Sequence, residues 1–242
     1  MENSRCAILV PAGHSIEPHC ALTLGQLEAR GYPVRRLYGF SQVDVARNRL
    51  ATDALAEGFE ELMWIDSDIA FAPESVDRLR AHGLPVTCGL YPKKGERALS
   101  SQLVPGTDRL VFGQGGGLVE IRYAAAGFLH TRREVYAEIQ RREALPVCHR
   151  RFGQPTVPFF LPMVVPEGDD HRYLGEDFAF SERLRRCGFR IVADTTIRLQ
   201  HIGIYGYSWE DLGGSLPRSA SYELSFRREE GAAEFGPSGQ TS

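Results

Sequence analysis

Two carboxylates one residue apart, Asp66 and Asp68, follow an apolar run from Leu62 to Ile65. A run of this length, with Pro73 a few residues further on, predicts a buried central strand that ends at Asp66. In open α/β sheets ligands bind outside the carboxyl ends of the strands, so both acids are expected at that edge. Two oxygen donors placed in this way suit Mg²⁺ or Mn²⁺, which take their remaining ligands from water and a substrate phosphate. The alternative is a solvated loop, because aspartate is common in turns.

A second pair of acids, Glu176 and Asp177, stands at the start of an expected helix that runs to Cys187. Asp177, Phe180 and Leu184 fall at helical spacing, so Asp177 heads the buried face of that helix. A helix N-terminus favours an ionised carboxylate, while the neighbouring acid opposes ionisation. This balance can hold Asp177 in the range where it accepts a proton from a hydroxyl. Helix capping is the alternative role, worth about 0.3–1 kcal/mol for each acid.

His201 is the third candidate. It follows an expected strand at 196–199 and precedes Gly203, where the missing side chain allows a close approach by another backbone or a ligand. A neutral imidazole that joins two carboxylates makes a mixed nitrogen and oxygen site, which suits Mn²⁺ better than Mg²⁺. The alternative is a structural histidine beside apolar residues.

Strands and helices that must position these side chains alternate along the first 90 residues. Apolar runs and turn signals predict strands at 7–10, at 34–38, up to 66 and at 86–90, with helices at 20–30, 42–57 and 73–82 between them. That order predicts an α/β fold with a doubly wound, mostly parallel sheet, similar to a Rossmann fold.

The remainder of the chain is less regular. Short strands at 99–104, 110–112 and 118–123 are separated by glycine-containing turns and are expected to form a small antiparallel portion. We expect a small-residue strand at 125–129, a helix at 132–142, a long loop at 146–170 with an edge strand near 159–164, and a strand at 190–193. The polar, glycine-rich residues from about 227 are expected to be disordered. The prediction is a single domain over 1–210 and a partly disordered tail over 211–242.

Composition limits the class of protein. The chain has 242 residues, of which 43% are hydrophobic and 24% charged, enough for one large globular domain. Its net charge of -3 provides no electrostatic basis for binding nucleic acid. Five scattered cysteines without a C-x-x-C spacing indicate reduced thiols. The short apolar run near the N-terminus is far below the length of a signal peptide or membrane span, so we expect a cytoplasmic protein without an integral membrane segment.

The order of these motifs resembles that of the GT-A glycosyltransferases, particularly the bacterial family 2-like enzymes. The similarity extends from about Ala7 to Gly203 and rests on three motifs in order: Asp66-Ser67-Asp68, the Glu176-Asp177 helix and His201. It depends on the ordered set, since no one of the motifs is specific.

The resemblance implies a role for each motif. Asp66 and Asp68 would hold Mn²⁺ or Mg²⁺ and the diphosphate of a nucleotide sugar, with His201 as a third metal ligand. Asp177 would be the catalytic base and Glu176 an acceptor contact. Residues expected in the donor site are Pro11, Ala12 and Gly13 at the base, Asp44 and Arg47 at the nucleoside, and Ser67 between the two acids. The first loop reads Pro-Ala-Gly-His instead of the family's Pro-x-Tyr/Phe-Asn, which leaves the base preference open.

The predicted function is therefore metal-dependent transfer of a hexose from a nucleotide-diphosphate donor, UDP-linked by resemblance, to a hydroxyl acceptor. Direct displacement is expected, with Asp177 as base. Lys93, Lys94 and Arg97 either contact phosphate or acceptor or form a solvated charge run, and the charge run is the preferred interpretation. Aromatic residues Tyr205, Tyr207 and Trp209 either stack on a sugar or pack against the domain.

Three other functions remain open. A HAD-like phosphatase also places Asp-x-Asp after an apolar strand, but normally on the first strand and followed by Thr or Val where Ala70 stands here. A nucleotidyltransferase would need a glycine-rich phosphate loop after Val10, which is missing. A non-catalytic module that binds nucleotide sugars is the third alternative.

Overall fold

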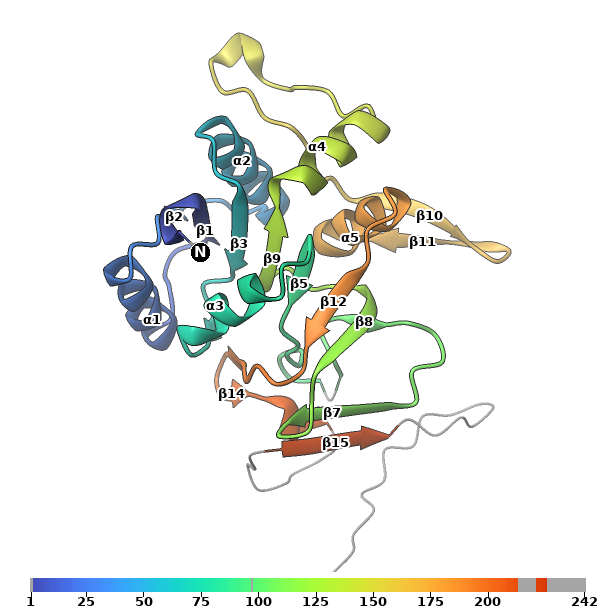
Figure 1. The fold of residues 1–242 in the computed structure, drawn as a ribbon. Helices are drawn as coiled ribbons and strands as arrows, with labels where there is room; N and C mark the ends of the chain where they lie inside the picture. Colours follow the sequence, from blue (N-terminus) through green and yellow to red (C-terminus); the bar gives the residue numbers. More distant parts are fainter. Residues whose placement is uncertain (1, 97, 213–220, 226–242) are drawn as a thin grey trace, which may run out of the picture.

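The computed structural model describes residues 2–96, 98–212 and 221–225. Within these residues, an eight-stranded sheet with the order β2-β1-β3-β9-β5-β12-β8-β6 forms the central layer (Figure 1). Its strands are β1 (Cys6–Pro11), β2 (Val34–Leu37), β3 (Glu61–Ile65), β5 (Val86–Cys88), β6 (Gln102–Leu103), β8 (Leu118–Tyr123), β9 (Phe128–Arg132) and β12 (Ile191–Asp194).

The strand directions confirm the predicted α/β fold. β1 pairs in parallel with β2 and β3, and β12 pairs in parallel with β5. β9 lies between β3 and β5 and is antiparallel to both, while β8 is antiparallel to β12. β6 is also antiparallel to β8, so β9 and β8 run opposite to the other six strands. The sheet is therefore mixed, with most strands parallel as predicted, but the antiparallel pairings are more extensive than the small portion expected. The insertion of β9 between β3 and β5 was not predicted.

Helices cover both faces of this sheet because its buried strands alternate between two cores. In β3, Leu62 and Trp64 belong to one core cluster and Met63 and Ile65 to the other. The first cluster includes residues of α2 (Val43–Ala56), α4 (Arg133–Arg142) and α5 (Glu176–Arg186), and the second includes residues of α1 (Pro18–Ala29) and α3 (Glu74–Ala81). β3 is thus buried on both sides, and only its carboxyl end is free to present functional groups.

Three smaller sheets surround the central one. β13 (Gln200–Ile202) lies between β14 (Gly206–Tyr207) and β4 (Ile69–Ala70), all antiparallel. β10 (Met163–Glu167) and β11 (Asp170–Leu174) form a hairpin that extends outward beside α5 (Figure 1). β7 (Arg109–Gly113) pairs with β15 (Ser221–Ser225). Short 3₁₀ turns occur at Asn3–Arg5, Arg150–Phe152 and Trp209–Leu212.

The prediction of a long loop at 146–170 with an edge strand near 159–164 is right only in part: the chain is irregular up to residue 162, but the strand is shifted and is followed by a second strand. Phe159 and Phe160 lie in a turn, buried against the rings of Tyr136 and Trp64 at 5.0 and 5.1 Å. The strand begins only at Met163, and the chain returns through β11 across a turn at Gly168, whose φ of 62° favours glycine.

Two shorter predictions fail. The segment 110–112 does not pair with its sequence neighbours, because Gly113 and Gly117 are hydrogen-bonded to Thr195 and do not form a hairpin turn. The expected strand at 196–199 is instead largely a turn, in which the Asp194 carboxylate accepts a hydrogen bond of 2.9 Å from the Thr196 amide.

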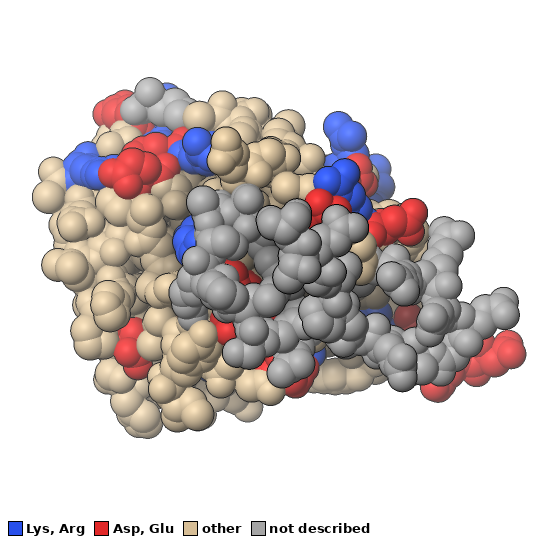
Figure 2. All heavy atoms as spheres, turned by 90° about the horizontal axis from the view of Figure 1, so that it is seen from below, with Lys and Arg blue, Asp and Glu red and all other residues tan. Residues whose placement is uncertain are grey.

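Several expectations concern the ends and surface of the molecule. The prediction of disorder from residue 227 lies outside the described residues, as does the position of Arg97. In the described part of the chain, no helix has the length and apolarity needed to cross a bilayer. On the face seen in Figure 2, the described Lys, Arg, Asp and Glu side chains are mixed and do not form a continuous basic surface.

Candidate active site

The Asp66-Ser67-Asp68 segment lies in a tight turn at the carboxyl end of β3. The Ile69 amide donates to the Asp66 carbonyl at 3.1 Å, so the chain reverses within four residues and enters β4. β4 pairs with β13, and the Ile202 amide donates to the Asp68 carbonyl at 2.7 Å. Pairing of these two short strands brings His201 to Asp68 across 133 residues of sequence, as the numbering shows.

Gly127 packs directly against the Asp66 carboxylate. Its amide donates to the Tyr91 hydroxyl at 2.9 Å, and its carbonyl accepts the Asp66 amide at 3.0 Å. A Cβ at Gly127 would lie 2.8 Å from Asp66 Oδ2 and would also overlap the Tyr91 hydroxyl. Only glycine therefore fits between the two side chains. Burial raises the pKa of Tyr91 far above its usual value, so its hydroxyl stays protonated.

Arg47, on α2, lies between the two acidic motifs and contacts both. Its side chain is 2% exposed, its Nη2 lies 2.7 Å from Asp66 Oδ1, and its Nε lies 3.7 Å from Glu176 Oε1. The guanidinium also lies over the rings of Trp64 and Phe160, at 5.7 and 5.9 Å. Burial alone would lower the pKa of Arg47, but the acids around it outweigh burial, so the group stays charged. Arg47 Nε and Nη1 have no hydrogen-bond partner among the described residues.

Asp177 stands at the first turn of α5, after the N-cap residue Gly175. Its Oδ1 accepts a hydrogen bond of 2.7 Å from the Phe178 amide. Burial, followed by the charge of Glu176, raises the pKa of Asp177 to about 7, and Arg47 offsets only part of that rise. At neutral pH this carboxyl group is therefore divided between its acid and base forms.

Asp68 faces two cationic or potentially cationic groups. Lys94 Nζ donates to Asp68 Oδ2, and His201 Nε2 lies 3.7 Å from Asp68 Oδ1. Burial would raise the pKa of Asp68, but His201 and Lys94 together hold it below its ordinary value. Asp68 is therefore ionised.

His201 is oriented by its other ring nitrogen. Nδ1 lies 3.0 Å from the Pro92 carbonyl, which can only accept, so Nδ1 carries a proton. In the neutral ring, Nε2 then presents a lone pair to the Asp68 carboxylate. Two acceptors that face each other are satisfied by a second proton or by a metal ion, and a carbonyl on the remote nitrogen is the usual partner of a metal-bound histidine.

The residues fit a metal site with two protein ligands rather than three. Asp68 Oδ1 and His201 Nε2 face each other, whereas the Asp66 carboxylate is turned to Arg47. Among the described residues, no group of three or more His, Cys, Asp or Glu side chains surrounds one metal position. Two protein ligands are enough for Mg²⁺ or Mn²⁺ when water and substrate phosphate supply the remainder.

The first loop lies at the same edge of the sheet. Pro11 ends β1, the Ala12 amide donates to the Leu37 carbonyl at 2.8 Å, and the Gly39 amide donates to the Gly13 carbonyl at 2.9 Å. The Glu17 amide donates to the Ser67 carbonyl at 2.8 Å, which links this loop to the acidic turn. Asp44 is half-buried in the first turn of α2, one turn before Arg47. The predicted donor-site residues thus lie at the carboxyl ends of β1 and β3, in the loops that follow them and in the first two turns of α2.

Three residues of the site are not placed there by the preferred sequence interpretation. A solvated charge run is the preferred interpretation for Lys94, yet its ammonium contacts Asp68. Tyr91 and Gly127 carry no motif that singles them out. One available signal is that Lys93 and Lys94 are the only lysines in a chain with 28 basic residues. Trp209 is buried and packs 5.4 Å from the ring of Phe112, so packing is its observed role.

Comparison with known proteins rests on structure alone. No family model matches the chain, and no curated protein does. The crystal structure of A197 from STIV matches 97% of this chain and 100% of its own, with a TM-score of 0.56 and 18% identity. GalNAc-T7 with UDP, GalNAc and Mn²⁺ matches 84% of this chain and 44% of its own, with a TM-score of 0.41 and 13% identity. A glycosyltransferase involved in the glycosylation of the major capsid of PBCV-1 matches 57% and 68%, with a TM-score of 0.30 and 13% identity.

The match to A197 extends over nearly the whole of both chains and shows a shared fold. Together with the strand order, it confirms the α/β fold of the GT-A type that the sequence resemblance predicted.

Proposed function

We propose that this protein is a metal-dependent glycosyltransferase, which moves a sugar from a nucleotide-diphosphate donor to a hydroxyl acceptor. The observation that supports this most is the approach of two acidic motifs, 110 residues apart, to one buried arginine. Arg47 contacts Asp66 and lies 3.7 Å from Glu176, and Asp177 beside it has a pKa of about 7. A solvated turn or a helix cap requires no such arrangement.

Donor binding is assigned to the acidic turn and its neighbours. Asp68 and His201 would hold the divalent metal, which suits Mn²⁺ because the ligands are one oxygen and one nitrogen. When bound, the metal offsets the negative charge that develops on the leaving diphosphate. Lys94 adds a positive charge at the same place, and Asp66 accepts a hydrogen bond from a donor hydroxyl while Arg47 fixes its orientation. UDP is the expected nucleotide.

Asp177 is assigned as the base. The acceptor oxygen attacks the anomeric carbon as its proton passes to Asp177, and the bond from that carbon to the diphosphate oxygen breaks with its electron pair on the diphosphate. The protonated Asp177 then returns its proton to solvent. A base with a pKa near 7 is suited to this step at neutral pH, because a substantial fraction of it is ionised and the ionised form accepts a proton readily.

A thermal-shift screen with UDP, GDP, CDP and dTDP, each with and without Mn²⁺, tests the donor site. A ligand present at a hundred times its Kd stabilises the folded state by about 2.7 kcal/mol. We expect one nucleotide, UDP by resemblance, to raise Tm only when Mn²⁺ is present, and Asp68→Asn to remove that shift. If none of the four shifts Tm, the glycosyltransferase proposal fails and the phosphatase or another binding function takes its place.

A further inference from the structure

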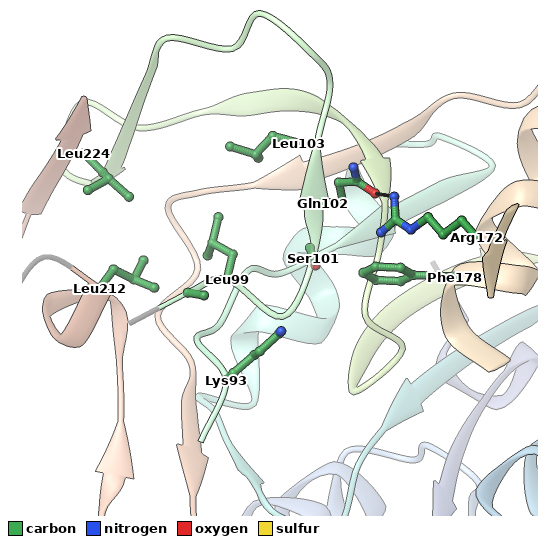
Figure 3. Close-up of a pocket in the computed structure, with 10 residues that line it drawn as sticks. Lys93, Leu99, Ser101, Gln102, Leu103, Arg172, Phe178, Leu212 and Leu224 are labelled. Atoms are coloured by element: carbon green, nitrogen blue, oxygen red, sulfur yellow. Dashed lines mark hydrogen bonds between the residues drawn. The ribbon is translucent and has the colours of Figure 1, made fainter. Parts of the chain in front are cut away.

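The two lysines of the chain, Lys93 and Lys94, are adjacent in sequence, but their side chains lie in two different sites. Lys94 contacts Asp68 in the candidate donor site, while Lys93 lines a separate cavity of about 440 Å³. Figure 3 shows the Lys93 ammonium directed inward among the side chains of that cavity. A pocket of this volume is large enough for a small organic molecule.

The cavity lies beside the catalytic helix. Phe178, the residue after Asp177, forms one wall. On another wall, the Ser101 hydroxyl accepts a hydrogen bond of 3.1 Å from the Ala125 amide, two residues before Gly127. The Ser100 amide donates to the Tyr91 carbonyl at 3.0 Å. The walls of the cavity are thus bonded to the same segments that position Asp66.

The lining is apolar with a cationic rim. The Phe178 ring and four leucine side chains from three segments line the cavity: Leu99, Leu103, Leu212 and Leu224. The charged lining residues are Lys93 and Arg172, and none of the described lining residues is an acid.

Both cations are able to take a further anionic partner. Lys93 pairs with Glu96 at 3.1 Å, with both side chains about half exposed, and such a pair is worth at most about 1 kcal/mol. Arg172 donates to Gln102 Oε1 at 3.0 Å, and its guanidinium lies 6.0 Å from the ring centre of Phe178. Arg172 also pairs with Glu167 at 3.6 Å, but that pair is long and partly exposed and is worth at most about 1 kcal/mol, so the arginine's charge remains available to a phosphate or carboxylate.

We infer that this cavity binds the acceptor, and that the acceptor is an apolar hydroxyl compound that carries one anionic group. The apolar body lies against the leucines and Phe178, and the phosphate or carboxylate lies between Lys93 and Arg172. This inference rests on the proposed function, because it places the acceptor next to the helix that carries the base.

Lysine labelling makes the test direct. Protein grown with ¹³C-labelled lysine has two side-chain Cε resonances, which Lys93→Met and Lys94→Met assign. The probes are octyl phosphate, for an alkyl phosphate, and 4-phenylbenzoate, for an aryl carboxylate. Inorganic phosphate and 1-octanol are the controls, because each carries only half of the recognised chemistry.

We expect one probe to shift the Lys93 resonance saturably while the Lys94 resonance does not move. The probe that binds shows whether the anionic group is a phosphate on an alkyl chain or a carboxylate on an aromatic ring. Leu103→Glu, which places an acid in the cavity, should weaken that binding at least tenfold. Arg190→Met should not, since Arg190 is exposed just before β12, pairs with Glu120 and does not line the cavity. Because Leu103→Glu can affect folding, Lys93→Met measured by calorimetry is the second variant and should weaken binding severalfold.

Two results would overturn the inference. One is that neither probe moves Lys93, and the other is that inorganic phosphate or octanol alone moves it as much as the complete probe. Binding at the donor site is measured separately from binding in the cavity, since UDP with Mg²⁺ should shift the Lys94 resonance. If Lys94 responds and Lys93 does not, only the cavity assignment fails. If Lys93 responds and Lys94 does not respond to any of the four nucleotides, the cavity binds its ligand but the proposed transferase function fails.

Discussion

Similar clusters of ionisable side chains lie at the two ends of β3, but the cluster at its start is buried and the Asp68 cluster beyond its end is partly exposed. At its start, Glu61 accepts two hydrogen bonds of 2.9 Å from the buried Arg80 and lies 2.7 Å from His130 Nε2. At its end, Asp68 faces Lys94 and, at 3.7 Å, His201. The Glu61 and Asp68 clusters each have one carboxylate, one histidine and one basic side chain, but only the Glu61 cluster is closed. Asp66, at the same end as Asp68, pairs separately with Arg47.

The difference lies in burial and in the choice of cation. Arg80 and His130 are buried, and Arg80 presents a fixed fork that matches a carboxylate. Lys94 and Asp68 are about one-third exposed, and an ammonium on a flexible stem exchanges partners easily. The buried Glu61 cluster stabilises the fold, whereas the partly exposed Asp68 cluster allows Asp68 to exchange Lys94 for a ligand. Residue types alone therefore do not distinguish a structural cluster from a site.

Asp177→Asn tests the base and should have the largest effect. An amide cannot accept the acceptor's proton, so transfer should fall about 10²–10⁴-fold. Nucleotide binding should stay within a factor of about three, because Asp177 is not assigned to the donor. Single-turnover sugar transfer and calorimetry measure the two quantities, and an active Asn variant would place the base elsewhere.

Glu61→Gln tests the closed end of β3. It leaves the buried Arg80 guanidinium without its charged partner, which costs about 3–5 kcal/mol in proteins. Urea unfolding should show this loss, and the remaining folded protein should still bind nucleotide. Glu60→Gln is the matched control, since its pair with Arg5 is exposed and should contribute less than about 1 kcal/mol. Equal stability of the two variants would contradict the comparison.

The raised pKa of Asp177 also predicts how stability depends on pH. The native state keeps this proton up to about pH 7, whereas the unfolded chain releases it near 3.9. The native state binds more protons in that window, so the free energy of unfolding falls as pH rises through it. Asp177→Asn removes this term and should raise Tm more at pH 8 than at pH 5, by about 2–4 °C for each kcal/mol. Scanning calorimetry at both values checks it, with the exposed Asp169→Asn as control.

Lys94→Met tests the open end and should have the smallest effect. Without nucleotide, Lys94 competes with a metal for Asp68, so its removal should tighten Mn²⁺ binding severalfold. With nucleotide present, the lost positive charge should weaken diphosphate binding by a similar factor. Mn²⁺ titration followed by electron paramagnetic resonance measures both, and Lys93→Met should change neither. The diagnostic result is that Mn²⁺ binding without nucleotide becomes tighter while diphosphate binding becomes weaker. Weaker binding of both would mean that Lys94 only supports the fold.

Local patterns in the sequence were enough to predict much of this fold. The apolar run before Asp66, the helix after Gly175 and the alternation of strands and helices each depend on neighbouring residues, and the structure has them close to the predicted bounds. The pairing of β3 with β9 joins Ile65 to Phe128, and no periodicity indicates which distant strand will insert there. The β10–β11 hairpin was hidden by prolines that usually indicate loops.

The site was predictable only in part for the same reason. Asp66, Asp68, Asp177 and His201 stood out by type and order. The sequence could not indicate that Arg47 would hold Asp66 away from His201, because that contact depends on how α2 packs on the sheet. Gly127 and Tyr91 act through a close approach between loops, and neither carries a local motif.

Donor hydrolysis compared between wild type and Asp177→Asn tests the proposed chemistry most directly, because it needs no knowledge of the acceptor. UDP-, GDP-, CDP- and dTDP-linked sugars are incubated with Mn²⁺, and release of the nucleoside diphosphate is measured between pH 5 and 9. We predict slow release from one donor class, with a rate that rises through a pKa near 7 and is lost in Asp177→Asn. Release that is equal in the variant, or no release from any of the four donor classes, would contradict the assignment of this site to sugar transfer.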